Sequence, residues 1–198
     1  MHVDKAMGNL GYERAELDFY PTPAEVTEAL VPFLKMHRGA EMAAFPLWEP
    51  GCGTGAMSEV LEKNFAPAEI LSTDIKNYGY SKHKGGNIDF LAQNCPYHGS
   101  IVTNPPFGDD AEKFIRKALA LTKFCGGNVA MLLRNEYDSA SGRNDLFNNA
   151  PFARKVVLTW RPRWIPLSTG APRHNNAWFI WDWCWEGPPV LSYALRGK

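Results

Sequence analysis

The sequence lacks several features that would immediately assign it to a compartment or a class. Its 21 basic residues balance its 21 acidic residues, so no overall field draws it toward nucleic acid or membrane. No apolar run approaches the length that spans a bilayer, and segment 1–18 is polar, without a secretory signal. The four cysteines are far apart, and only Cys95 and His98 approach the spacing of a ligand pair. These absences predict a cytoplasmic protein with free thiols, no membrane partner and no metal site.

One sign of charge is missing from a long part of the chain. From Leu146 to Trp181 there is no aspartate or glutamate. The basic residues of this stretch are Arg154, Lys155, Arg161, Arg163, Arg173 and His174. They predict either a solvated basic face or a local surface that binds anions.

The length and the hydrophobic pattern predict a single α/β domain. A chain of 198 residues that is 45% hydrophobic can form one sizeable core and is short for two domains. Strands are expected at 45–49, 69–75, 87–91, 100–104, 128–134, 155–160 and 176–185. Helices are expected at 22–34, 56–65, 109–124 and near 143–147. This alternation predicts a doubly wound, mostly parallel seven-stranded sheet over 1–198, with an N-terminal arm at 1–18 and a short substrate loop at 161–175.

Local signals add detail to these elements. Thr22 with Glu25, and Asp109 with Glu112, have the spacing of capping boxes at two helix starts. The last predicted strand is rich in tryptophan, at positions 178, 181, 183 and 185. Tryptophans can stack on bases, but their alternation in a strand favours packing in the core.

A glycine-rich turn, EPGCGTGA, follows the first predicted strand at 49–56. Gly51, Gly53 and Gly55 allow the backbone to approach a ligand closely, and the next helix offers its N-terminal amides. The same residues fit a loose dinucleotide-binding pattern, and Asp74 lies about twenty residues further on, where it would accept hydrogen bonds from a ribose diol. The turn alone therefore indicates a nucleoside-containing cofactor and leaves its identity open.

The run SIVTNPPFGDD at 100–110 begins like a buried strand and ends in a rigid corner. Pro105 and Pro106 fix the backbone torsion φ and donate no backbone hydrogen bonds. The side-chain oxygen of Asn104 and the carbonyl of Pro105 would accept the two hydrogens of an exocyclic amino group. Phe107 would offer a ring on which a planar base stacks. The corner therefore favours methylation of an amino group over hydride transfer.

These motifs resemble those of a known family. NPPF is similar to the (D/N/S)-PP-(Y/F) motif of amino-group methyltransferases, and EPGCGTG is similar to their S-adenosylmethionine (SAM) loop. FYPTP at 19–23 resembles the N-terminal motif of DNA adenine-N6 methyltransferases with the same motif order. The likeness to small phage and bacterial enzymes continues through LLRNEY, Arg143 and RPRW. It implies a Rossmann-like class I methyltransferase fold and SAM-dependent methylation of adenine N6 in DNA.

The resemblance also implies roles for individual residues. The cofactor would contact Tyr20, Thr22, Glu49, Gly51, Gly53, Asp74, Asp89 and Phe90. The catalytic corner that holds the target base would comprise Asn104, Pro105, Pro106 and Phe107. Contacts to the nucleic acid substrate would come from Arg161, Arg163, Trp164 and Arg173.

Other readings of the same motifs stay open. RNA guanine methyltransferases and protein-glutamine methyltransferases use the same corner, and a silent methyltransferase fold could serve as a binding module. The chain also departs from DNA adenine methyltransferases, which usually carry a target-recognition region of many tens of residues. Here only segment 161–175 is left for that task. Relaxed specificity, help from a second copy in a homo-oligomer or from an accessory chain, or a substrate other than duplex DNA would account for this difference.

Overall fold

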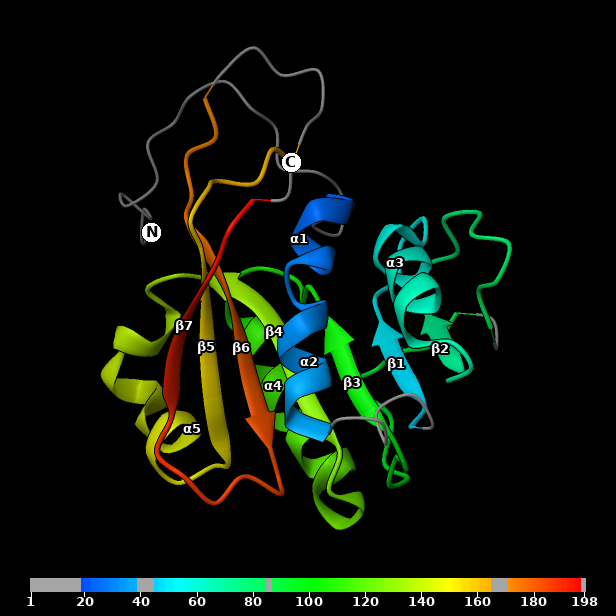
Figure 1. Cartoon of the computed structure of the whole chain (residues 1–198). Helices are drawn as coiled ribbons and strands as arrows, with labels where there is room; N and C mark the ends of the chain where they lie inside the picture. Colours follow the sequence, from blue (N-terminus) through cyan, green and yellow to red (C-terminus); the bar gives the residue numbers. More distant parts are fainter. Residues whose placement is uncertain (1–18, 39–44, 85–86, 165–170, 197–198) are drawn as a thin grey trace, which may run out of the picture.

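The computed structural model describes residues 19–38, 45–84, 87–164 and 171–196 (Figure 1). Its strands are β1 (Leu47–Pro50), β2 (Ile70–Thr73), β3 (Ser100–Thr103), β4 (Asn128–Arg134), β5 (Phe152–Leu158), β6 (Asn176–Asp182) and β7 (Val190–Ala194). Its α-helices are α1 (Ala24–Glu28), α2 (Val31–Arg38), α3 (Ala56–Phe65), α4 (Asp109–Thr122) and α5 (Asn144–Asn148). Short 3₁₀ helices are η3 (Lys123–Cys125), η4 (Tyr137–Ser139) and η5 (Ser141–Arg143). Among these described helices, none has the length and apolar character needed to cross a membrane.

The seven strands form one sheet in the order β2-β1-β3-β4-β6-β5-β7. Strand β1 runs parallel to β2 and β3, β3 runs parallel to β4, and β5 runs parallel to β7. Strand β6 is antiparallel to both of its neighbours, β4 and β5. The strand order reverses at β1, because β2 lies on one side of it and β3 on the other. In open sheets of this kind, ligands bind beyond the carboxyl ends of the strands at such a reversal. The predicted fold class is therefore confirmed.

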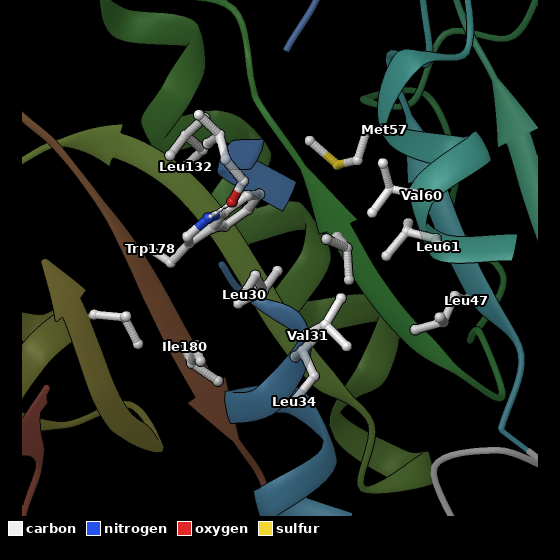
Figure 2. Close-up of a cluster of buried hydrophobic side chains, with 14 of the residues drawn as sticks. Leu30, Val31, Leu34, Leu47, Met57, Val60, Leu61, Leu132, Trp178 and Ile180 are labelled. Atoms are coloured by element: carbon white, nitrogen blue, oxygen red, sulfur yellow. Dashed lines mark hydrogen bonds between the residues drawn. The ribbon is translucent and has the colours of Figure 1, made fainter. Parts of the chain in front are cut away.

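One face of the sheet is covered by α1, α2 and α3 (Figure 1). Figure 2 shows Leu30 and Leu34 from this helical layer gathered with Trp178 and Ile180 of β6, while Leu61 of α3 lies nearby. The indole Nε1 of Trp178 donates a 2.8 Å hydrogen bond to the Val26 carbonyl, which ties the first helix to the sheet.

The opposite face is covered by α4 and α5 (Figure 1). Ile115 of α4 packs against Ile101 of β3 and against the apolar side chains of β4 and β6 in one buried cluster. Trp181 of β6 donates a 2.8 Å hydrogen bond from Nε1 to the Leu146 carbonyl of α5. Trp178 and Trp181 are therefore core residues, as predicted, whereas Trp183 and Trp185 lie beyond the end of β6.

Two predicted elements differ from the structure. Segment 87–91 is no strand, because it contributes only an isolated bridge from Asn87 to Asp74. There the Asp89 carboxylate accepts the Leu91 amide hydrogen, a local turn that competes with strand pairing. The helix predicted at 22–34 is divided into α1 and α2, because Pro32 has no amide hydrogen for a continuous helix.

The predicted capping boxes are also wrong. The N-cap residues of α1 and α4 are Pro23 and Gly108, and neither cap has a side-chain hydrogen bond. Gly108 has a φ of 81° and a ψ of −141°, a conformation that glycine reaches most easily. The chain turns at Gly108, so α4 begins at Asp109 and this residue is not the N-cap. Strand β7 was not predicted from the sequence.

Candidate cofactor and substrate site

The glycine turn after β1 is held against the end of β2. The amides of Gly51 and Cys52 donate to the Thr73 carbonyl at 2.6 and 2.9 Å, and the Gly53 amide donates to Asp74 Oδ2 at 2.8 Å. Gly53 has a φ of 54°, and a Cβ added there would lie 2.7 Å from the Phe19 ring. A side chain at this position would therefore collide with the segment that precedes α1.

A cavity of about 460 Å³ lies at the reversal of strand order, within the size range of small-molecule sites. Segment 19–22, the turn after β1, the chain after β2, and the corner after β3 with α4 contribute to its lining. The predicted cofactor residues that line it are Tyr20, Thr22, Glu49, Gly51, Asp74, Asp89 and Phe90. Gly53 is not among the lining residues and lies against the Phe19 ring. Seven of the eight predicted cofactor residues thus surround one cavity.

The lining of this cavity carries charge of one sign. Its carboxyl groups belong to Glu49, Asp74, Asp89 and Asp110, and the described residues that line it include no lysine, arginine or histidine. Such a lining attracts cationic ligands and repels anionic ones. It suits the net positive charge of SAM far better than the anionic pyrophosphate of a dinucleotide.

Glu49 is the most deeply buried of these acids, with 3% of its surface exposed. Burial raises the pKa of Glu49 from its ordinary value of 4.5 to about 8, and the nearby Asp74 carboxylate adds to this increase. The Ser58 hydroxyl donates a hydrogen bond to Glu49 Oε2 and lies 2.6 Å from the Ser72 hydroxyl, so a buried polar chain joins β1, α3 and β2. Burial therefore favours the uncharged form of Glu49 in the free protein, and the negative charge of the lining comes mainly from Asp74, Asp89 and Asp110.

The corner after β3 contains an acceptor without a donor. Asn104 lines the cavity, and its side-chain oxygen is buried with no hydrogen-bond partner. Leaving such an oxygen unpaired costs about 1–3 kcal/mol. Pro106 also lines the cavity, whereas Pro105 and Phe107 do not. The Asn104 side-chain oxygen is therefore a buried acceptor without a donor, on a residue of the cavity wall.

Aromatic side chains border the site on the side of segment 19–22. The centroids of the Phe107 and Tyr20 rings lie 5.6 Å apart, with an angle of 43° between the ring planes. Tyr20 is therefore a neighbour of Phe107, the ring predicted to stack on a base. Phe19 stacks on Tyr78 with ring centroids 4.2 Å apart and planes 8° apart. Phe19, Ile75, Tyr78, Asp110 and Phe114 line the cavity but were not predicted. Phe19 belongs to the FYPTP motif and Asp110 ends the run SIVTNPPFGDD, whereas no motif contains Ile75, Tyr78 or Phe114.

Asp89 and Phe90 lie in the same wall of the cavity but have different surroundings. Asp89 is exposed. Phe90 is 3% exposed and packs edge-on against Trp48, with centroids 5.2 Å apart. Phe90 thus belongs to the core as well as to the cavity wall.

The predicted nucleic acid contacts lie elsewhere. Arg161, Arg163, Trp164 and Arg173 are not among the residues that line the cavity. Arg161 Nε donates to Asn175 Oδ1 at 2.9 Å, which joins the chain after β5 to the chain before β6. Trp164 packs against the core under α1 and α2. Residues 165–170 of the predicted substrate loop, and the arm at 1–18, lie outside the described residues.

Two basic residues of the acid-free stretch, Arg154 and Lys155, interact with groups of the protein itself. Lys155 Nζ pairs with the Asp138 carboxylate at 2.8 Å, and its ammonium lies over the Phe179 ring. Arg154 donates to the Ser192 hydroxyl at 2.6 Å, and burial lowers its pKa. These two basic residues on β5 are thus held by groups of the protein itself. One partner is a carboxylate and the other a hydroxyl, and both are too distant in the sequence for the local pattern to show them.

The cysteines of this structure form no disulfide bond. All four cysteines are free, as predicted, and Cys52 is buried beside Glu49 in the cavity wall. Burial raises the pKa of the Cys52 thiol to about 12, so the thiol stays protonated. Among the described residues, no group of three or more His, Cys, Asp or Glu side chains is placed to hold a metal ion.

Comparisons with solved structures identify the fold. No family model and no curated protein matches the chain. A Listeria monocytogenes protein assigned as a class I S-adenosylmethionine-dependent methyltransferase is 14% identical, with a TM-score of 0.63 over 89% of this chain and 66% of that one. A Pyrococcus horikoshii protein assigned as an RNA methyltransferase is 15% identical, with a TM-score of 0.65 over 89% of this chain and 92% of that one.

A third match is the M protein of the type I restriction enzyme EcoKI, which is 13% identical with a TM-score of 0.53. The match covers 81% of this chain and 43% of the M protein, so this chain spans less than half of that protein. At these identities the likeness concerns the fold. The chain has the Rossmann-like fold of class I SAM-dependent methyltransferases.

Proposed function

We propose that the protein is a SAM-dependent N-methyltransferase that methylates the N6 amino group of adenine in DNA. The observation that carries this proposal is the orphan Asn104 oxygen at the wall of an acidic cavity, in this fold. A solved structure with similar folding, a magnesium protoporphyrin IX methyltransferase from Synechocystis, contains bound SAH and has a TM-score of 0.50. The methyl donor and its demethylated product are therefore the first ligands to test.

The residues of the cavity fit SAM. Asp74, at the end of β2, would accept the ribose hydroxyls, while Ile75 and Phe90 would flank the adenine with apolar surface. Ile75 lines the cavity and is 57% exposed, so its apolar surface is open to a ligand there. Glu49 and the turn at Gly51 would lie near the charged methionine end. When bound, SAM supplies a methyl group on a positively charged sulfur.

The corner would orient the accepting nitrogen. Asn104 Oδ1 and the Pro105 carbonyl would accept the two amino hydrogens, which fixes the direction of the nitrogen lone pair. In the transfer, the N–C bond would form as the S–C bond breaks with its electrons left on sulfur, and the nitrogen would then release one proton to solvent. A target base in a duplex must first leave its stack, at a cost of a few kcal/mol. The protein accelerates the transfer mainly through proximity and orientation.

DNA adenine is the substrate that the motif order favours. The presence of a restriction-enzyme M protein among the structural matches is compatible with this substrate. The match to a protein assigned as an RNA methyltransferase keeps RNA as the second candidate. A protein glutamine is a third, because its side-chain amide presents the same two hydrogens to the corner.

The test is methyl transfer from labelled SAM to separate pools of DNA, RNA and protein. We expect label in DNA, and digestion to nucleosides should give N6-methyladenine. Label in RNA alone, or in glutamine of protein alone, would contradict the DNA assignment while retaining the enzyme class. If SAM binds but no pool is labelled by the parent protein, the fold serves as a binding module instead.

A further inference from the structure

Four basic residues from three separate segments gather beyond the carboxyl ends of β4 and β5. Arg134 ends β4, Arg161 follows β5, and Arg173 and His174 precede β6. The guanidinium groups of all three arginines act electrostatically on the His174 imidazole. We call these four residues the basic cluster.

Hydrogen bonds hold the three segments of the basic cluster together. Arg161 Nε donates to Asn175 Oδ1 at 2.9 Å, and the Asn135 amide donates to the Asn175 carbonyl at 3.0 Å. Asn175 therefore joins the end of β4 to the chain after β5. The basic side chains are gathered by the fold rather than by their order in the sequence.

The charge of the basic cluster is poorly balanced by the protein. Among the described residues, the ion pairs within 4 Å include Arg116, Arg143 and Lys155 but none of the three arginines of the cluster. Glu136 is the carboxylate that acts on His174 in the opposite direction to the arginines. Like charges held together destabilise a surface unless an anion joins them. This arrangement is typical of a site for an anionic group.

The cluster lies close to the catalytic corner. Thr103 of β3 is paired with Met131 of β4, so Asn104 is level with Leu132, two residues before Arg134. Two residues of strand extend about 7 Å, and neighbouring strands are about 4.8 Å apart. A base at Asn104 and a phosphate at Arg134 are thus separated by a distance that one nucleotide can span.

We propose that the basic cluster binds the backbone phosphate next to the target nucleotide, so that the substrate is a nucleic acid strand and not a protein. This inference rests on the proposed function, because it takes Asn104 as the place of the target base. Arginine is suited to this task, since its planar guanidinium binds phosphate oxygens with two parallel hydrogen bonds. Such contacts position a strand without reading its sequence.

His174 makes this binding depend on pH. Partial burial, and after it the guanidinium of Arg134, lower the pKa of His174, while Glu136 raises it and Arg173 and Arg161 lower it further. The imidazole is therefore largely neutral at neutral pH in the free protein. A phosphate placed among these groups favours the charged imidazole, so the strand should bind together with a proton and more tightly at acid pH.

The test is fluorescence anisotropy of a labelled single-stranded oligodeoxynucleotide that contains adenine, at constant ionic strength between pH 5.5 and 8. Arg134→Gln should weaken binding about tenfold or more, as expected for a lost charged contact. His174→Gln should bind like the parent at pH 8 and lack the gain at pH 5.5. Lys84→Gln is the matched control, because it removes one exposed charge beside β2, at the other edge of the sheet.

Three outcomes would overturn the inference. These are equal binding by the parent and Arg134→Gln, the same pH profile in the parent and His174→Gln, and equally tight binding of a polyglutamate peptide of matched charge. Methyl transfer by the parent protein, measured alongside strand binding, separates this inference from the proposed function, because the basic cluster can bind the strand whether or not methyl transfer follows. If the cluster variants lose binding but the parent transfers no methyl group, the phosphate site stands and the proposed activity fails.

Discussion

The carboxyl edge of the sheet is acidic on one side and basic on the other. Beyond β1 and β2, and at the start of α4, four carboxyl groups line the cavity: Glu49, Asp74, Asp89 and Asp110. Beyond β4 and β5, the basic cluster brings three arginines and a histidine together with Glu136. Asn104 follows β3, between these two regions.

This difference is hidden in the balanced charge of the whole chain, 21 basic and 21 acidic residues. A cationic methyl donor would bind in the acidic cavity and an anionic strand at the basic cluster. Each would meet charge of the opposite sign only if the cavity and the cluster are separated in space. The strand order does this, since β3 separates the carboxyl ends of β1 and β2 from the carboxyl end of β4 and the start of the antiparallel β6. The two reactants would therefore meet at the boundary, where the orphan oxygen of Asn104 lies.

The largest effect is expected where the two regions meet. Asn104→Ala should lower kcat by roughly 100- to 1,000-fold, because the amino nitrogen loses its fixed orientation at the methyl donor. SAM affinity should stay nearly unchanged, since the variant removes no predicted cofactor contact. Steady-state methylation and calorimetric binding of SAM measure the two quantities separately.

Asn104→Asp is the conservative control for this variant. Its carboxylate still offers acceptors, so we expect partial activity. Methylation by Asn104→Ala at the parent rate would show that the corner is structural and that the mechanism is wrong.

A second variant tests whether Glu49, one of the acids of the cavity, is ionised at neutral pH. Because the pKa of Glu49 is raised from 4.5 to about 8, the stability it provides is complete below pH 4.5 and is lost as pH rises through 8. Glu49→Gln cannot ionise, so between pH 5.5 and 8.5 it should gain roughly 2–4 kcal/mol relative to the parent. Urea unfolding at several pH values measures this difference. Parallel pH profiles would mean that Glu49 is already ionised at neutral pH.

A third variant removes one charge from the acidic region. Asp74→Ala should weaken binding of SAM and of SAH by roughly 10- to 100-fold, which corresponds to the loss of one charged acceptor worth about 1.5–3 kcal/mol. Asp74 also accepts the Gly53 amide, so thermal unfolding must confirm that the variant is folded. Asp89→Ala is a matched comparison, because Asp89 is an exposed acid of the same cavity. Unchanged affinity in a folded Asp74→Ala protein would contradict the ribose assignment.

The parts of the fold that could be predicted from sequence are those with strong local patterns. The buried run 128–134 and the amphipathic run 56–65 became β4 and α3 with the expected bounds. Strand β7 was missed because its residues follow a proline pair and only Ala194 of the strand is buried, so this edge strand lacks the apolar run of a core strand. The predicted strand at 87–91 was wrong because the Asp89 side chain forms a turn there.

In the candidate site too, residues that belong to local motifs could be predicted, and contacts between distant segments could not. Most of the predicted cofactor residues, together with Asn104 and Pro106 of the corner, line one cavity. Contacts between distant segments could not be predicted, because no local pattern pairs Phe19 with Tyr78 or Lys155 with Asp138. Arg134 joins the basic cluster for the same reason, since it lies outside the acid-free stretch in sequence and beside it in space.

The smallest effect concerns the salt dependence of strand binding. Each phosphate contact contributes about one unit to the slope of log affinity against log salt concentration. Arg161→Ala should therefore reduce the slope by about one unit, whereas Lys84→Ala, beside β2, should leave it unchanged. Equilibrium binding of a single-stranded oligonucleotide between about 50 and 200 mM salt measures the slope. A flat slope in the parent protein would mean that the basic region contacts no phosphate, and a protein substrate would then fit the acidic cavity and the Asn104 corner better.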